Sequence, residues 1–124
     1  MFHIRTRDQL MSHLADRGNL AVATLEQLDL DIELVPTLAE AVLLNCRIAP
    51  GSKMPSDLSA ATFIDCQLPE LSFDHASLFG ARFLRCDLSR SVFKDCDLSA
   101  SSFVDCRWEG VVLKDCDLDA ASLS

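Results

Sequence analysis

Glycine and proline are scarce in this chain of 124 residues, with four copies of each. A disordered chain is usually rich in polar, proline and glycine residues, whereas 49% of the residues here are apolar. The chain therefore has enough apolar material to bury a core, and its length fits a single domain.

Long apolar runs are also absent. No stretch approaches the 18 or more apolar residues of a membrane-spanning helix. The first ten residues, MFHIRTRDQL, lack the apolar stretch of a signal peptide. We therefore expect a cytoplasmic protein without a membrane partner, whose six cysteines are reduced thiols.

Basic residues are outnumbered, with 11 Lys and Arg against 19 Asp and Glu, which gives a net charge of −8. Direct nucleic-acid binding needs clustered Lys and Arg to neutralise phosphates, so this balance disfavours it. The same charge permits a basic partner, or serves only solubility.

Recognisable catalytic and cofactor motifs are missing as well. The three histidines, His3, His13 and His75, have no spacing that suggests metal ligation with a second histidine or a carboxylate. The chain has no glycine-rich phosphate loop and no Ser–His–acid arrangement. We expect no enzyme activity, no cofactor and no metal, and we interpret His75 as a solvated surface residue.

A period of five residues is the dominant feature of the sequence. A large apolar residue, here called the centre, recurs at every fifth position without interruption. The fourteen centres are Leu58, Phe63, Leu68, Phe73, Leu78, Phe83, Leu88, Phe93, Leu98, Phe103, Trp108, Leu113, Leu118 and Leu123. Neither a helix nor a strand has this period, so a repeating supersecondary unit must generate it.

A second residue, mostly small, lies two positions before each centre, for example Ala61, Cys66 and Ala81. Polar residues crowd the other three positions of the unit. We therefore expect two positions in five to point inward and three to point outward.

The units CDLSR (86–90), CDLSA (96–100) and CDLDA (116–120) resemble the pentapeptide-repeat family, whose consensus reads A-[DN]-L-x-x. The resemblance implies an all-β solenoid, a right-handed quadrilateral parallel β-helix with four pentapeptides in each coil. Centres that are 20 residues apart should then stack in columns, as Leu58, Leu78 and Leu98 would.

Four of the cysteines, Cys46, Cys66, Cys86 and Cys106, share one such column. We interpret them as small hydrophobic residues that face the core. A vertical ladder does not converge as the ligands of zinc do, and disulfides between coils are marginal in geometry.

The register extends back to Leu38 and Leu43 and fails at Lys53, inside a turn-rich loop at about residues 50–56. Because the loop preserves the 20-residue phase, we expect it to replace one side of a coil. The predicted repeat domain thus covers residues 36–124, a little over four coils.

The first 35 residues are expected to form a separate N-terminal cap. A helix is predicted over 7–17, since Thr6 and Gln9 fit a capping box and Gly18 fits a C-terminal cap. Its expected apolar face holds Leu10, Met11 and Leu14. A half-buried strand is predicted over 28–34, where Leu28, Leu30, Ile32 and Leu34 alternate with acids.

No equivalent cap is recognisable at the other end, so we expect its coil to expose core and strand edges. This end could pair with the same end of a second copy and form a homodimer. The proposed self-association residues are Trp108, Leu113, Leu118 and Leu123.

A second expected surface is a stripe of aliphatic residues, each following a centre of one column: Leu44, Ile64, Leu84 and Val104. Phe79 is another outward apolar residue, and Val92 and Val112 repeat the pattern on the opposite face. An exposed apolar patch commonly marks an interface with another protein, here of unknown identity. Alternatively, such residues merely suit a strand surface, or the N-terminal segment covers them.

The leading interpretation is thus a non-catalytic interaction module. One alternative comes from the family, since its quinolone-resistance members resemble duplex DNA and bind DNA gyrase, a type II topoisomerase. The acidic residues that could serve such mimicry are Asp97, Asp105, Asp115, Asp117 and Asp119. Against it, Arg85 lies between Asp65 and Asp105 in one expected column, as in a salt-bridge ladder. A further alternative, an accessory of a bacterial secretion-system effector, has only family precedent.

Overall fold

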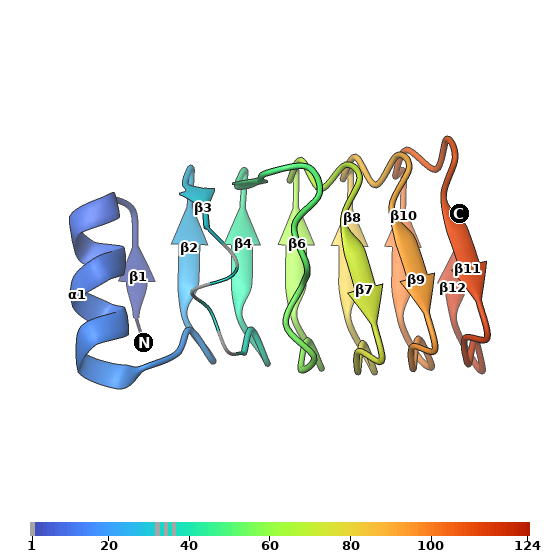
Figure 1. Ribbon diagram of the computed structural model, residues 1–124, viewed down its shortest axis with the longest axis horizontal. Coiled ribbons are helices and arrows are strands. Elements are labelled where there is room, and N and C mark those ends of the chain that lie inside the picture. The colour runs from blue at the N-terminus through green and yellow to red at the C-terminus, as the bar shows by residue number, and fades with distance from the viewer. Residues whose placement is uncertain (1, 32, 34, 36) are drawn as a thin grey trace.

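The computed structural model describes residues 2–31, 33, 35 and 37–124. The chain winds into a right-handed quadrilateral parallel β-helix of about six turns, with one short helix at its N-terminal end (Figure 1). The predicted fold class is confirmed. The number of turns exceeds the predicted four or so, because the winding begins well before residue 36.

Four parallel ladders make up the sides of the solenoid. The largest is a seven-stranded sheet, whose order is β1 (His3–Ile4), β2 (Thr24–Glu26), β4 (Val42–Leu44), β6 (Thr62–Ile64), β8 (Arg82–Leu84), β10 (Ser102–Val104) and β12 (Ser122–Leu123). Another side consists of β7 (Ser72–Asp74), β9 (Val92–Lys94) and β11 (Val112–Lys114). A third side pairs β3 (Asp29–Leu30) with β5 (Arg47–Ile48) and continues as single bridges through Gln67, Asp87 and Arg107. The fourth side consists of single bridges that link Asp57, Ser77, Asp97 and Asp117.

Each pentapeptide forms one short side and one corner. The residue two positions after the centre turns the chain with a left-handed backbone, as at Asp65, whose φ is 55°. The N–H of Asp65 donates to the carbonyl of Leu84 on the next turn at 2.9 Å. This hydrogen bond offsets the cost of a left-handed backbone at a residue with a side chain. Non-glycine residues serve at most corners, which explains why so few glycines suffice. These corners are Val22, Gln27, Glu40, Asn45, Ala60, Asp65, Glu70, His75, Arg85, Arg90, Asp95, Ala100, Asp105, Asp115 and Ala120.

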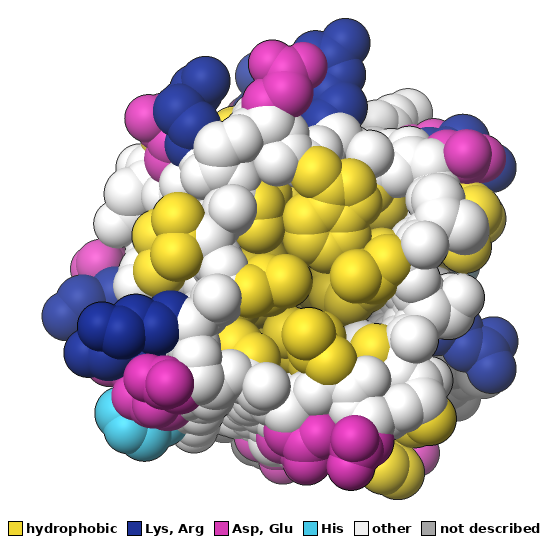
Figure 2. All heavy atoms as spheres, turned by 90° about the vertical axis from the view of Figure 1, so that its right-hand side faces the viewer, with side chains coloured by type: hydrophobic (Ala, Val, Ile, Leu, Met, Phe, Trp, Pro, Cys, Tyr) yellow, Lys and Arg dark blue, Asp and Glu magenta, His cyan; other side chains and the backbone are white. Residues whose placement is uncertain are grey.

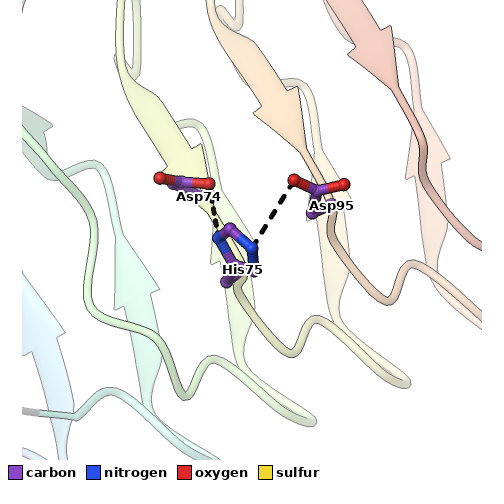
Figure 3. Close-up of side chains that lie close together, drawn as sticks. All are labelled: Asp74, His75 and Asp95. Carbon is purple, nitrogen blue, oxygen red and sulfur yellow. Dashed lines mark ion pairs between the residues drawn. The ribbon is translucent and has the colours of Figure 1, made fainter.

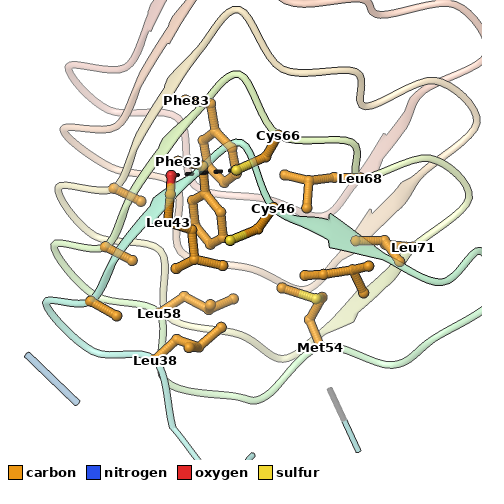
Figure 4. Close-up of a cluster of buried hydrophobic side chains, with 14 of the residues drawn as sticks. Leu38, Leu43, Cys46, Met54, Leu58, Phe63, Cys66, Leu68, Leu71 and Phe83 are labelled. Atoms are coloured by element: carbon orange, nitrogen blue, oxygen red, sulfur yellow. Dashed lines mark hydrogen bonds between the residues drawn. The ribbon is translucent and has the colours of Figure 1, made fainter. Parts of the chain in front are cut away.

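The predicted inward columns form the core. The rings of Phe63, Phe83 and Phe103 stack with centroids 4.7 Å apart and planes within 2°. Phe73 and Phe93 stack at 4.3 Å on the facing side. Leucine and cysteine columns fill the space between these stacks, as Figure 4 shows for the middle of the solenoid. Apolar columns therefore fill the interior of the solenoid. Among the described residues, every buried side-chain nitrogen and oxygen atom has a hydrogen-bond partner.

The loop that contains Pro50 and Pro55 replaces one side of a coil. Lys53, which breaks the period, forms a bridge with Ser72 and stays in contact with solvent. Met54, one position later, is only 7% exposed and takes the place of the missing centre (Figure 4). A one-residue shift therefore keeps the apolar column continuous.

The helix α1 spans Arg7–Arg17, the range predicted from its caps. Gln9 N–H donates to Thr6 Oγ1 at 3.1 Å, and Gly18 ends the helix with a φ of 76°. Leu10 is buried, whereas Met11 is 45% exposed and does not share the buried face as expected. Figure 1 shows α1 beyond β1, at the N-terminal end of the stack.

The turns of the solenoid begin before residue 35, where the boundary of the repeat domain was predicted. Leu25 is paired with Leu43 and Leu30 with Ile48, a spacing of 18 rather than 20 residues. The predicted strand over 28–34 is reduced to β3, and positions 32 and 34 lie outside the described residues. The first complete turn is two residues shorter than the 20-residue turns that follow, so the 20-residue period does not extend into it.

Candidate interaction surfaces

The C-terminal face of the solenoid is apolar (Figure 2). Leu113, Leu118 and Leu123 are 37%, 40% and 51% exposed. The residues directly beneath them in the same columns, Phe93, Leu98 and Phe103, are all 0% exposed. The last described turn therefore presents side chains of core type to solvent.

Trp108 lies beside Leu123 on this face. Its ring is half-buried and packs on Phe103 with centroids 4.9 Å apart. Cys106, Trp108, Leu123 and Ser124 line a shallow hollow there. The four predicted end residues are thus brought together on one face, with Trp108 the least exposed of them.

The same face also has open strand edges. In covered turns the N–H of a centre donates to the next turn, as from Leu88 to the Arg107 carbonyl at 3.1 Å. The N–H of Leu98 donates likewise to the Asp117 carbonyl at 2.8 Å. Their equivalents one turn later, Trp108 and Leu118, have no such acceptor within the described chain. Unpaired edges of this kind favour pairing with another chain.

The aliphatic stripe runs along the seven-stranded sheet. Leu44, Ile64, Leu84 and Val104 are consecutive partners in the parallel register. All four side chains are half-buried, so the stripe is less exposed than predicted. The helix α1 lies at the end of the stack and not along these strands, so this part of the N-terminal segment does not cover the stripe (Figure 1). Glu26, paired with Leu44 in register and bound to Arg5 at 3.3 Å, ends the stripe with a charged group.

Three other outward apolar residues are exposed to solvent. Phe79 is 54% exposed, and Val92 and Val112 are 38% and 48% exposed on the opposite sheet. Val92 and Val112 do not form one continuous surface with the stripe, because β9 and β11 belong to a different side of the solenoid.

The acidic residues are exposed but largely committed to local bonds. Arg85 binds both carboxylate oxygens of Asp65, at 2.7 and 3.1 Å, and holds the pKa of that carboxyl below its usual range. Arg90 lies 3.5 Å from Glu70. This is the cross-coil pairing expected from the sequence. The five residues proposed for mimicry, Asp97, Asp105, Asp115, Asp117 and Asp119, are all exposed near the C-terminal end.

Several aspartates stabilise turns. Asp97 accepts hydrogen bonds from the hydroxyl and the backbone N–H of Ser99, which lower the pKa of Asp97. Asp57 accepts the same two bonds from Ser59. The Asp-x-Ser pattern in the repeat is therefore explained by its own turn, which weakens its value as a sign of function.

The cysteine ladder faces inward as expected, and all six residues are free thiols. The Cys66 thiol donates to the carbonyls of Leu43 and Ile64, both at 3.4 Å (Figure 4). Burial raises the pKa of the Cys96 thiol. These bonds and this burial keep the protonated thiol, so the buried cysteines act as core residues.

Sequence analysis missed one polar cluster. Asp74, His75 and Asp95 offer ligand atoms that all lie within 4.8 Å of one another (Figure 3). His75 Nδ1 lies 2.7 Å from Asp74 Oδ1, and Nε2 lies 3.5 Å from Asp95 Oδ2. The available signal was the 20-residue period, which places Asp95 one turn above His75.

The geometry defines a parallel β-solenoid with one covered end and one apolar end. Comparison with protein families places the chain more narrowly. The model for pentapeptide repeats matches residues 56–95 and 91–124 with 8 copies, more than half of the chain. The protein belongs to the pentapeptide-repeat family. A comparison with curated proteins gives no match.

Solved structures share the fold at low sequence identity. Rfr23, a pentapeptide repeat protein from the cyanobacterium Cyanothece 51142, aligns with a TM-score of 0.56 and 16% identity, covering 96% of this chain and 100% of its own. Full-length QnrB1, a plasmid-mediated fluoroquinolone resistance protein, aligns with a TM-score of 0.50 and 12% identity, covering 99% of this chain and 84% of its own. At these identities the likeness concerns the fold. Separately, the described part of the chain contains no helix that is long and apolar enough to cross a membrane.

Proposed function

We propose that this protein is a non-catalytic interaction module that self-associates through its C-terminal face and binds a partner protein along its aliphatic stripe. One observation supports self-association above all others. The side chains of Leu113, Leu118 and Leu123 are between 37% and 51% exposed, whereas the residues of the same columns in the preceding turn are fully buried. A second copy of this face would cover them as the next turn covers their neighbours.

A two-fold arrangement suits this face because the same patch can serve both copies. The apolar side chains lie at its centre, and backbone and polar groups surround them (Figure 2). That is the usual anatomy of an interface, with an apolar core inside a polar rim. Association would also cover the open strand edges.

The mass in solution tests self-association. Light scattering on the wild type should give twice the monomer mass of 13.6 kDa. A Leu118→Lys, Leu123→Lys variant should give the monomer mass, because two ammonium groups cannot be buried unpaired. A Val92→Lys, Val112→Lys variant is the matched control, since it adds the same charge on a side of the solenoid. A monomeric wild type would refute this part of the proposal.

The aliphatic stripe is the surface proposed for the partner. Its residues are half-buried rather than fully exposed, and a flat, regular β-surface of this type offers an apolar area with little side-chain entropy to lose. Leu84 lies in its middle, between Ile64 and Val104 in register.

A Leu84→Asp change tests the stripe. It should abolish partner capture while leaving the circular dichroism spectrum and the unfolding midpoint close to those of the wild type. Val92→Asp places the same charge on the opposite sheet and should retain capture. Capture by the Leu84→Asp variant equal to that of the wild type would show that the stripe is only a strand surface.

A second candidate function, inhibition or protection of a type II topoisomerase by DNA mimicry, is favoured by the cluster of five exposed aspartates near the C-terminal end. The ion pairs of Arg85 and Arg90 cancel part of the field on the middle turns. A gyrase supercoiling assay separates the two candidates. Inhibition that is lost in an Asp115→Asn, Asp117→Asn, Asp119→Asn variant would favour mimicry over the interaction module.

A further inference from the structure

His75 lies between two carboxylates that come from its own turn and the next. Asp74 precedes it at the end of β7, and Asp95 follows β9, one turn later (Figure 3). His75 Nδ1 is 2.7 Å from Asp74 Oδ1, a hydrogen-bond distance. His75 Nε2 is 3.5 Å from Asp95 Oδ2.

This arrangement sets the roles of the two ring nitrogens. A neutral imidazole whose Nδ1–H donates to Asp74 presents the Nε2 lone pair to Asp95. Two lone-pair groups then face each other across 3.5 Å, an arrangement that calls for a cation between them. A proton on Nε2 relieves the repulsion, and so does a metal ion.

The distances suit a metal ion. Zinc binds imidazole nitrogen at about 2.0–2.1 Å and carboxylate oxygen at about 2.0–2.2 Å, so both atoms can reach one ion when they are about 3–3.5 Å apart. A carboxylate on the other ring nitrogen is the usual outer partner of a metal-binding histidine, because it fixes the tautomer and raises the basicity. Asp74 is placed for that role.

We propose that Asp74, His75 and Asp95 form a surface site for a divalent transition-metal ion of the zinc class. His75 Nε2 and Asp95 are the ligands, Asp74 orients the ring, and water completes the coordination. The two carboxylates and a neutral imidazole carry a charge of −2, which the ion neutralises.

The backbone holds the site in place. His75 N–H donates to the Lys94 carbonyl at 2.9 Å, and β7 and β9 are in continuous register. Lys94 is the register partner of Asp74, and Lys114 that of Lys94. Neither lysine forms an ion pair with the three residues of the site among the described contacts, but both lower the local negative potential. Asp115, one turn above Asp95, opposes that effect.

Nuclear magnetic resonance with cobalt(II) and calorimetry with zinc test the site, in a Cys106→Ser, Cys116→Ser background that removes the two partly exposed thiols. Cobalt should broaden or shift the amide signals near His75 and Asp95 before those of any other region. Zinc should bind with one-to-one stoichiometry. His75→Ala and Asp95→Asn should each weaken zinc binding at least tenfold, and Asp74→Asn about tenfold or more.

The variants are chosen to keep the fold, and the control matches the change in charge. Alanine already occupies the same left-handed corner at Ala60, Ala100 and Ala120, so His75→Ala should not disturb the turn. Asp97→Asn removes the same charge as Asp95→Asn outside the site and should leave zinc binding unchanged. Cobalt effects centred on another region, unchanged affinity in His75→Ala, or no saturable zinc binding would each overturn the proposal.

Discussion

At the scale of the residue, Phe83 shows what one repeat position contributes. Its ring is 1% exposed and stacks on Phe63 and Phe103 with centroids 4.7 Å apart. Phe83→Ala should lower the free energy of unfolding by about 3–5 kcal/mol, because it leaves a cavity in a column that cannot collapse. Urea unfolding measures the loss. Phe79→Ala removes the same ring at a position that is 54% exposed, and should cost far less. Equal effects would contradict the inward assignment of Phe83.

Asp97 provides a prediction on pH. The Ser99 hydroxyl and N–H lower the pKa of Asp97 below its usual value of 3.8. A carboxyl with a depressed folded-state pKa stabilises the fold fully above pH 3.8, and this stabilisation is lost as the pH falls through the lower value. Titration by nuclear magnetic resonance should give a midpoint below 3.8, and Ser99→Ala should raise it. The midpoint of Asp65, which depends on Arg85, should not move. An unchanged Asp97 midpoint in Ser99→Ala would refute the assigned cause.

The inward residues were predictable from the sequence, because burial in a stack favours a large apolar side chain at one position of each unit and a mostly small one at the other. The corner conformation was not. Positive φ occurs at Asp65, Glu70, His75 and Ala100, which share no side-chain type. Position within the unit decides the corner backbone, so no residue-type signal marks it. Met54 was missed for a similar reason, since a one-residue shift within the loop is invisible to the period.

At the scale of the element, the cysteine columns test how the last turn differs from those beneath it. Cys46, Cys66, Cys86 and Cys96 are at most 3% exposed, whereas Cys106 and Cys116 are partly exposed. In the monomeric Leu118→Lys, Leu123→Lys variant, a thiol reagent should therefore modify two of the six cysteines in the folded state, and the other four only on unfolding. The Cys86 thiol lowers the pKa of Cys106 to about 7, which favours reaction of Cys106 as the thiolate.

Single Cys106→Ser and Cys116→Ser variants identify the two reactive thiols by mass spectrometry. Rapid modification of Cys66 or Cys86 in the native state would contradict the inward orientation of the ladder.

Some elements could be predicted and others could not. The helix α1 follows from local caps at Thr6 and Gly18, which act within a few residues. The first complete turn was missed because its 18-residue spacing breaks the period. The pairing of His75 with Asp95 depends on two turns lying in register, so it is visible in the sequence only after the 20-residue coil has been recognised.

At the scale of the whole molecule, the two ends of the solenoid differ. The N-terminal end is covered by α1, whose Leu10 is 5% exposed. Arg17 and His13 of the same helix pack on the Phe2 ring, at 4.3 and 4.8 Å from its centroid. The C-terminal face has core side chains and open edges instead (Figure 2). Under the proposed function, this asymmetry leads to end-to-end pairing of two C-terminal faces rather than to the growth of a filament.

The 20-residue period predicted which residues share the last described turn, because it assigns each of them to a column. It could not predict what covers the face. Outward positions, such as those of Leu84 and Phe79, are not constrained by stacking, so the identity of a partner leaves no regular pattern in them.

Small-angle X-ray scattering tests the central claim most directly, because it separates association at the end from association along the side. If the C-terminal faces pair, the wild type should have about twice the maximum dimension of the Leu118→Lys, Leu123→Lys variant, with the same cross-sectional radius of gyration. A wild-type particle with the length of the variant and a larger cross-section, or one identical to the variant, would contradict the account.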